Sequence, residues 1–138
     1  MSMEKFANHI IAVAQENGKS ITNLQLQKVM YFVLKDARDY KILDENKLKE
    51  IYDEPFQVWA YGPVIKTQYN RFSNFGSSPI IGVFDKDDSL DDLRDTILAY
   101  LDMNVFDLVS KSHEVDFWKL NKPIGTFRTN AEYNLGDL

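Results

Sequence analysis

Apolar positions recur at helical spacing through the first forty residues of the chain. Spacings of three and four predict a helix over about residues 4–16. Thr22 is followed three residues later by Gln25, the pattern of a capping box, so we expect a second helix from there to about residue 40. The apolar stripe of the first helix comprises Phe6, Ile10, Val13 and Ala14. That of the second comprises Leu26, Val29, Met30, Val33 and Ala37.

Two runs in the middle of the chain have the composition of strands. Residues 56–61 are rich in strand-forming side chains, and residues 80–84 are apolar, β-branched and bounded by turn residues. We expect the two runs to pair as a small antiparallel β element. A helix between them is expected to begin at Pro63 and to end at Gly76.

The second half of the chain returns to helical spacing. Ser89 is expected to cap a helix, residues 105–111 add a further short helix, and Ser112 is expected to cap the last one. From about residue 123 the tail has no periodicity, so we expect it to be extended or loose. The pattern predicts one domain over residues 1–138, a predominantly helical α+β fold.

Composition and charge narrow the class of protein. A chain of 138 residues that is 44% hydrophobic is long enough and apolar enough for one globular domain. It has no Cys, which excludes disulfides and thiolate metal sites, and it shows neither a leader pattern nor a membrane-spanning run. We therefore expect a cytoplasmic protein without a membrane partner. The net charge of −5 disfavours nucleic acid and favours a basic partner.

Candidate catalytic chemistry is sparse. His9 and His113 are the only histidines, and the glycines stand singly rather than in a phosphate-binding loop. His9 lies beside the apolar stripe of the first helix, where we expect a partly buried structural histidine. The acidic stretch from Asp85 to Asp92 is typical of a solvated face at a helix start. We expect no enzyme, no cofactor and no metal site.

The first two predicted helices have the outline of a helix-turn-helix. On the second, Asn23, Gln25, Gln27 and Lys28 are side chains that can contact bases. Given the acidic balance, two packed core helices are the preferred interpretation, and a DNA-binding regulator is kept as a further alternative.

The densest local pattern runs from Trp59 to Val64. On a strand, Trp59 and Tyr61 would share one face, while Gly62 permits a sharp turn into a helix at Pro63. Lys28 either extends to solvent or meets a carboxylate or carbonyl group from the turn after Tyr61. Among the tyrosines, those expected at the surface are Tyr31, Tyr40 and Tyr52.

Three motifs in this order resemble the Panacea domain, also called the SocA-like antitoxin domain, of bacterial and phage-associated proteins. The first is Leu24-Gln25-Leu26-Gln27-Lys28-Val29-Met30-Tyr31 on the second helix. The second is Phe56-Gln57-Val58-Trp59-Ala60-Tyr61-Gly62-Pro63-Val64, followed by Tyr69 and Phe72. The third is Ser112-His113-Glu114 with Trp118, which Phe117 precedes where the family tends to have proline.

The resemblance implies an antitoxin that neutralises a cognate toxin, encoded nearby, by direct contact. The resemblance also implies an alternative, because at least one member of the family acts as an adaptor that presents its toxin to a protease. The alternative is therefore an adaptor or a phage-encoded host-interaction protein, with an unfoldase or protease as partner. The sequence leaves the oligomeric state open. The candidate partner-binding residues are Lys28, Tyr31, Trp59, Tyr61, Gly62, Pro63, His113 and Trp118.

Overall fold

The computed structural model describes residues 2–138. Within these residues there are seven α-helices and one three-stranded antiparallel sheet, which confirms the predicted fold class. The helices are α1 (Ser2–Glu16), α2 (Asn23–Asp39), α3 (Glu45–Ile51), α4 (Lys66–Arg71), α5 (Arg94–Leu101), α6 (Val105–Ser112) and α7 (Asp116–Asn121). The strands are β1 (Gln57–Trp59), β2 (Gly62–Val64) and β3 (Arg128–Glu132). Short 3-10 helices are η1 (Ser73–Phe75), η2 (Asp88–Leu93) and η3 (Leu135–Asp137).

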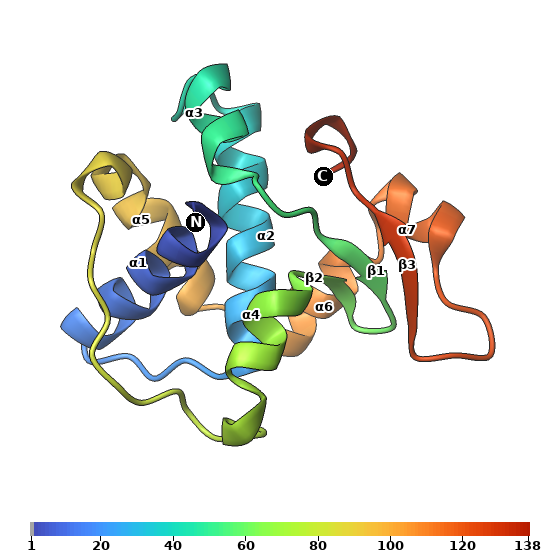
Figure 1. The fold of residues 1–138 in the computed structure, drawn as a ribbon, viewed down its shortest axis with the longest axis horizontal. Coiled ribbons are helices and arrows are strands. Elements are labelled where there is room, and N and C mark those ends of the chain that lie inside the picture. Colours follow the sequence, from blue (N-terminus) through green and yellow to red (C-terminus); the bar gives the residue numbers. More distant parts are fainter. Residues whose placement is uncertain (1) are drawn as a thin grey trace.

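Helix α2 forms the centre of the molecule. Helices α1 and α5 pack on one side of it, while the sheet, α6 and α7 lie on the other (Figure 1). Every residue from 26 to 34 is buried, so α2 has no solvent-exposed stripe along this stretch. Its polar members Gln27 and Lys28 must therefore find hydrogen-bond partners inside the protein.

The start of α2 follows the sequence pattern. The Gln25 backbone N–H donates to the Thr22 hydroxyl at 3.2 Å, and the Gln25 side chain accepts from the Thr22 N–H at 3.4 Å. This is the predicted capping box, with both of its bonds present. Gly18, which ends the turn after α1, has a φ of +67°.

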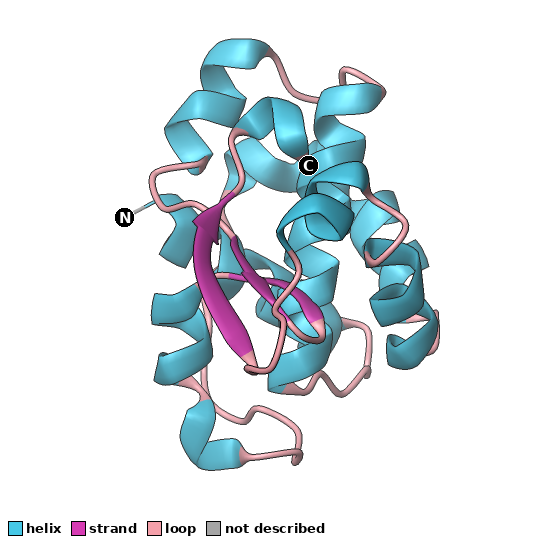
Figure 2. Ribbon diagram, turned by 90° about the vertical axis from the view of Figure 1, so that its right-hand side faces the viewer, coloured by secondary structure: helices cyan, strands magenta, loops and turns pink. Residues whose placement is uncertain are grey.

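The sheet has the order β2-β1-β3, so β1 is its central strand (Figure 2). The predicted pairing of residues 56–61 with residues 80–84 is wrong. β1 pairs instead with β2, through a two-residue turn at Ala60 and Tyr61, and with β3 from the tail.

Residues 80–84 form a loop. The Ile80 N–H donates to the Ile21 carbonyl at 2.8 Å, which ties this segment to the approach to α2 and not to the sheet. Ile80 is buried, whereas Ile81 and Val83 are exposed, so the apolar run is not a buried strand.

The expected helix start at Pro63 is also wrong, because Pro63 lies in β2 and α4 begins at Lys66. The Trp59–Gly62 pair closes the turn, which places the backbone groups of Pro63 on the outer edge of the hairpin. A proline, which has no N–H to donate, is tolerated at such an edge position.

The tail is extended but not loose along its last residues. The Tyr133 N–H donates to the Phe56 carbonyl at 2.9 Å, and the Tyr52 hydroxyl donates to the Tyr133 carbonyl at 2.6 Å. Tyr133 and Leu138 are buried. The tail therefore completes the core beside α2.

Candidate functional site

Lys28 is held under the β1–β2 hairpin. Its side chain is fully buried, and Nζ donates to the Pro63 carbonyl at 2.7 Å. Of the alternatives left open by the sequence, the carbonyl of the turn is the one found. Burial lowers the pKa of Lys28 from its ordinary value to about 7.

A second clamp reaches the hairpin from the end of α6 and from α7. His113 Nε2 lies 2.9 Å from the Ala60 carbonyl, and Trp118 Nε1 donates to the Trp59 carbonyl at 2.9 Å. Because a carbonyl oxygen only accepts, Nε2 of His113 carries the proton. The two rings stack with their centroids 3.7 Å apart. Burial lowers the pKa of His113, and Lys28 acts in the same direction, while the bond to Ala60 opposes them.

Gly62 is required by the close approach of these elements. It has a φ of +103°, and a Cβ there would overlap the Ser112 hydroxyl and lie 3.2 Å from Lys28 Cε. Ser112 was expected to cap the last helix, but it ends α6 and donates to the Val109 carbonyl at 2.7 Å. The three motifs of the resemblance therefore meet around one turn.

Most of the candidate partner-binding residues are buried or half-buried in the protein. β1 ends at Trp59, and Tyr61 lies in the turn that follows, so the expectation that the two share a strand face is wrong. Trp59 is buried, whereas Tyr61 is 49% exposed. All three tyrosines expected at the surface differ in burial. Tyr31 is fully buried, which contradicts the expectation, Tyr52 is half-buried, and Tyr40 is exposed as expected. The buried or half-buried candidates are Lys28, Tyr31, Trp59, Gly62, Pro63, His113 and Trp118. Tyr61 alone among the candidates is exposed.

An apolar groove of about 440 Å³ lies beside Tyr61. Its walls come from the start of α2, the hairpin, α4 and η1, the start of α6, and the residue before β3. The large apolar side chains that line it are Leu24, Trp59, Tyr61, Tyr69, Phe106 and Phe127. Its lining residues include none with a charged side chain, although 27% of the whole chain is charged.

Exposed aromatic rings border this groove. Phe106 is 62% exposed and Phe127 is 47% exposed, and the Phe127 ring contacts Tyr61 edge to face with centroids 5.6 Å apart. Sequence reasoning identified Tyr61 but missed the two phenylalanines. Phe106 follows the Asn104 cap of α6, and Phe127 depends on the pairing of β3, so neither is marked by the hairpin motif.

The polar floor of the groove is already satisfied internally. The Gln27 side chain donates to the Asn23 side-chain oxygen at 3.2 Å and accepts from the Ile65 N–H at 2.9 Å. Asn23 in turn donates to the Tyr69 carbonyl at 3.0 Å. Asn23, Gln27 and Lys28 are buried, so the helix-turn-helix interpretation loses three of its four base-contacting side chains.

His9 is more deeply buried than the partly buried position that we expected for it. It is fully buried, and its Nδ1 accepts from the Asp87 N–H at 2.9 Å. Burial lowers its pKa, although Asp91 and Asp87 oppose the change. Among residues 2–138, no group of three or more His, Asp or Glu side chains is arranged to hold a metal ion. Over the same residues, none of the helices combines the length and the hydropathy that a membrane span requires.

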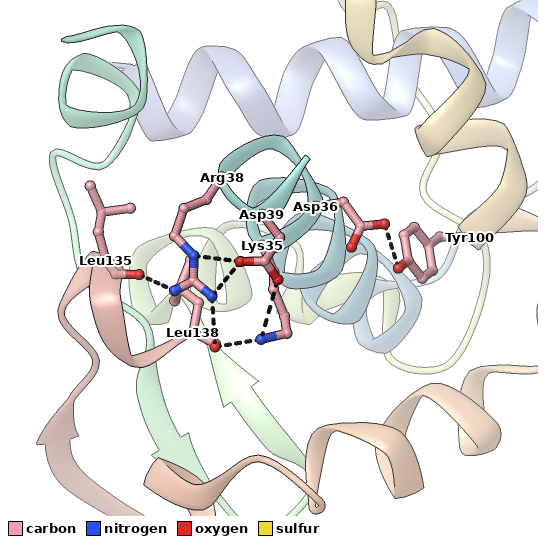
Figure 3. Close-up of polar contacts among 7 residues, drawn as sticks. All are labelled: Lys35, Asp36, Arg38, Asp39, Tyr100, Leu135 and Leu138. Carbon is pink, nitrogen blue, oxygen red and sulfur yellow. Dashed lines mark hydrogen bonds and ion pairs between the residues drawn. The ribbon is translucent and has the colours of Figure 1, made fainter. Parts of the chain in front are cut away.

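A cluster of charged residues on α2 holds the tail and was missed by the sequence analysis. Arg38 Nη1 donates to the Leu135 carbonyl at 2.6 Å, and Lys35 Nζ donates to the Leu138 backbone oxygen at 2.7 Å (Figure 3). Asp39 pairs with Arg38 at 2.7 Å and so orients the guanidinium group. The cluster thus anchors residues 135–138 to α2.

Comparison with known proteins gives no relative for this fold and site. No family model matches the chain, and no curated protein and no solved structure matches it. The resemblance to the Panacea domain accordingly stays a prediction.

Proposed function

We propose that this protein is an antitoxin-like binding module that neutralises a cognate toxin by direct protein–protein contact. The observation that supports it is the uncharged groove with exposed aromatic rings beside the hairpin. Aromatic side chains at a surface are typical of the anchor positions of protein interfaces. The net charge of −5 favours association with a basic partner.

The resemblance in sequence supports the same function, because its first two motifs supply residues of the groove wall and its third motif holds the hairpin that carries that wall. Lys28, His113 and Trp118 hold the backbone of the hairpin at three of its carbonyl groups. They thereby fix the position of Tyr61, which projects from the turn. A rigid, pre-organised surface loses less conformational entropy on binding than a mobile one.

Co-expression tests this function. The reading frame beside this gene is placed under one inducible promoter, and this protein under another. We expect the frame alone to stop growth, and growth to resume when this protein is induced, with the two proteins purifying as one complex. A version of this gene with an early stop codon is the control. A harmless neighbouring frame, or toxicity that co-expression leaves unchanged, rejects the proposal for this locus.

The half-life of the neighbouring protein separates the two modes of action. Neutralisation by occlusion leaves its half-life unchanged or longer when this protein is present. An adaptor that delivers the toxin to a protease shortens it, and the shortening disappears in a strain that lacks the unfoldase.

A further inference from the structure

We infer that the groove beside Tyr61 binds the apolar face of a basic amphipathic α-helix of the partner protein. This inference rests on the proposed function in that it takes the partner to be a protein. It adds the site, the secondary structure of the bound segment and the pattern of side chains that the site accepts.

The lining of the groove selects apolar anchors. Trp59 and Val64 are buried walls, and Phe106 and Phe127 stand at its border with about half of their surface in water. A charged side chain that entered would lose its hydration without meeting an opposite charge among the lining residues. A volume of about 440 Å³ lies within the range of about 300–1,000 Å³ in which sites enclose most of a small ligand, which is room for several apolar side chains.

The hydrogen bonding around the groove favours a helix over an extended peptide. An extended peptide binds by adding its backbone to an open sheet edge. Here the outer edge of β2 is closed by α2, because Lys28 donates to the Pro63 carbonyl and Gln27 accepts from the Ile65 N–H. A helix satisfies its own backbone and needs only side-chain contacts, at positions i, i+3 or i+4 and i+7.

The charge of the chain favours a basic helix. Asp and Glu number 21 against 16 Lys and Arg, and the charged residues lie outside the groove lining. Such a helix has apolar anchors on one face and Lys or Arg on the other. Its anchors would contact the uncharged walls of the groove, and its basic face would be attracted by the net negative charge of this protein.

Fluorescence anisotropy of labelled peptides with the purified full chain tests the inference. The probe is a Leu/Lys peptide of about 18 residues whose leucines follow helical spacing. One control peptide has Glu in place of every Lys, and another contains the same residues in an order without an apolar face. We expect saturable binding of the first peptide, and binding at least about tenfold weaker for both controls.

Two substitutions of equal charge locate the site. Phe106→Glu alters the border of the groove, and we expect it to weaken binding of the Leu/Lys peptide by about tenfold or more. Val83→Glu, at an exposed apolar residue in the loop of residues 80–84, should change the affinity by less than about twofold. Both positions are exposed, so both variants are expected to fold, and circular dichroism verifies this.

The possible failures are distinct. Absence of saturable binding, equal binding of the peptide without an apolar face, or equal affinity of Phe106→Glu overturns the groove assignment. A dimer in sedimentation velocity that Phe106→Glu dissociates also overturns it, because a second copy then fills the groove. If the peptide results hold but the neighbouring frame is not neutralised, the proposed function fails while the helix-binding groove stands. If neutralisation is undiminished in Phe106→Glu, only the groove assignment fails.

Discussion

Lys28 shows how one buried side chain closes the edge of a sheet. Its Nζ takes the position of a neighbouring strand by donating to the Pro63 carbonyl, and its stem packs beneath Gly62. An amine without an opposite charge nearby is costly to ionise in such a place, which is why burial is the sole cause of its lowered pKa.

The stability of the protein should therefore rise with pH across the neutral to mildly alkaline range. Lys28 has a pKa of about 7 in the folded protein, whereas a lysine in the unfolded chain has its ordinary pKa of 10.5. Between these values the unfolded state binds the additional proton, so the free energy of unfolding increases with pH. From pH 7 to pH 9 this one group contributes an increase of about 2 kcal/mol. Below pH 7 both states are charged and its contribution levels off.

Urea denaturation at pH 7 and pH 9 measures this increase. We expect Lys28→Met to remove most of it, because the methionine side chain does not titrate. Lys5→Met, on the exposed side of α1, is the matched control and should retain it. An equal increase in the Lys28→Met variant would assign the pH dependence to other groups. The pH stays below 10 because burial raises the pKa values of Tyr31 and Tyr133, and their ionisation would act in the opposite sense.

At the scale of elements, local signals were predicted well and long-range pairing was not. The capping box of α2 needs only residues 22–25 and was read directly from the sequence. β1 pairs with β2 and with β3. The residues of β3, Arg-Thr-Asn-Ala-Glu, carry no apolar alternation, so its pairing with β1 is set by tertiary context and not by propensity. Residues 80–84 have the stronger strand composition, yet they form a loop.

The candidate site likewise has one part that local sequence signals indicated and another part that they did not. The turn after Tyr61 was predicted from its glycine, and a contact of Lys28 with a carbonyl of that turn was one of the alternatives left open, but the sequence predicted a strand that runs into a helix there and not a β hairpin. The groove was not found, because Phe106 and Phe127 reach it from parts of the chain that only the folded structure brings together.

The tail is held by charged side chains of α2, and one of these contacts can be removed by substitution. Arg38→Gln loses the charged donor to the Leu135 carbonyl, and we expect the free energy of unfolding to fall by about 1–2 kcal/mol. Amide hydrogen exchange over residues 128–138 should become about tenfold faster, since those residues open when the anchor is weakened.

Lys49→Gln serves as the control for the tail. Lys49 is exposed and forms a surface ion pair with Glu45, a type of contact that contributes little to stability. Unchanged protection of residues 128–138 in Arg38→Gln would show that β3 and the buried side chains of the tail hold it without the charged cluster.

At the scale of the whole molecule, α2 joins two groups of elements that contact each other mainly through it. Helices α1 and α5 pack on one side, and β2 and α6 on the other, so its buried side chains serve both. Phe32 illustrates this, because its ring stacks on Tyr100 of α5 with centroids 5.4 Å apart and meets Tyr31 edge to face on the side of the sheet. Loss of packing at α2 should therefore destabilise both sides together.

Two probes can test this coupling in one experiment, one local to the side of the sheet and one that reports on the helices of both sides. Both tryptophans, Trp59 and Trp118, lie on the side of the sheet, whereas far-ultraviolet circular dichroism is dominated by the helices. We expect their urea transitions to coincide in the wild type, and Phe32→Ala to lower both midpoints with a loss of about 3–5 kcal/mol while they still coincide. Tyr40 is 75% exposed at the end of α2. Tyr40→Ala should therefore change the free energy of unfolding by no more than about 0.5 kcal/mol, as a surface substitution does, and both midpoints should stay close to those of the wild type. If the fluorescence transition of Phe32→Ala separates from the dichroism transition, the hairpin and its clamps form a unit that is stable apart from α1 and α5, and α2 does not couple them.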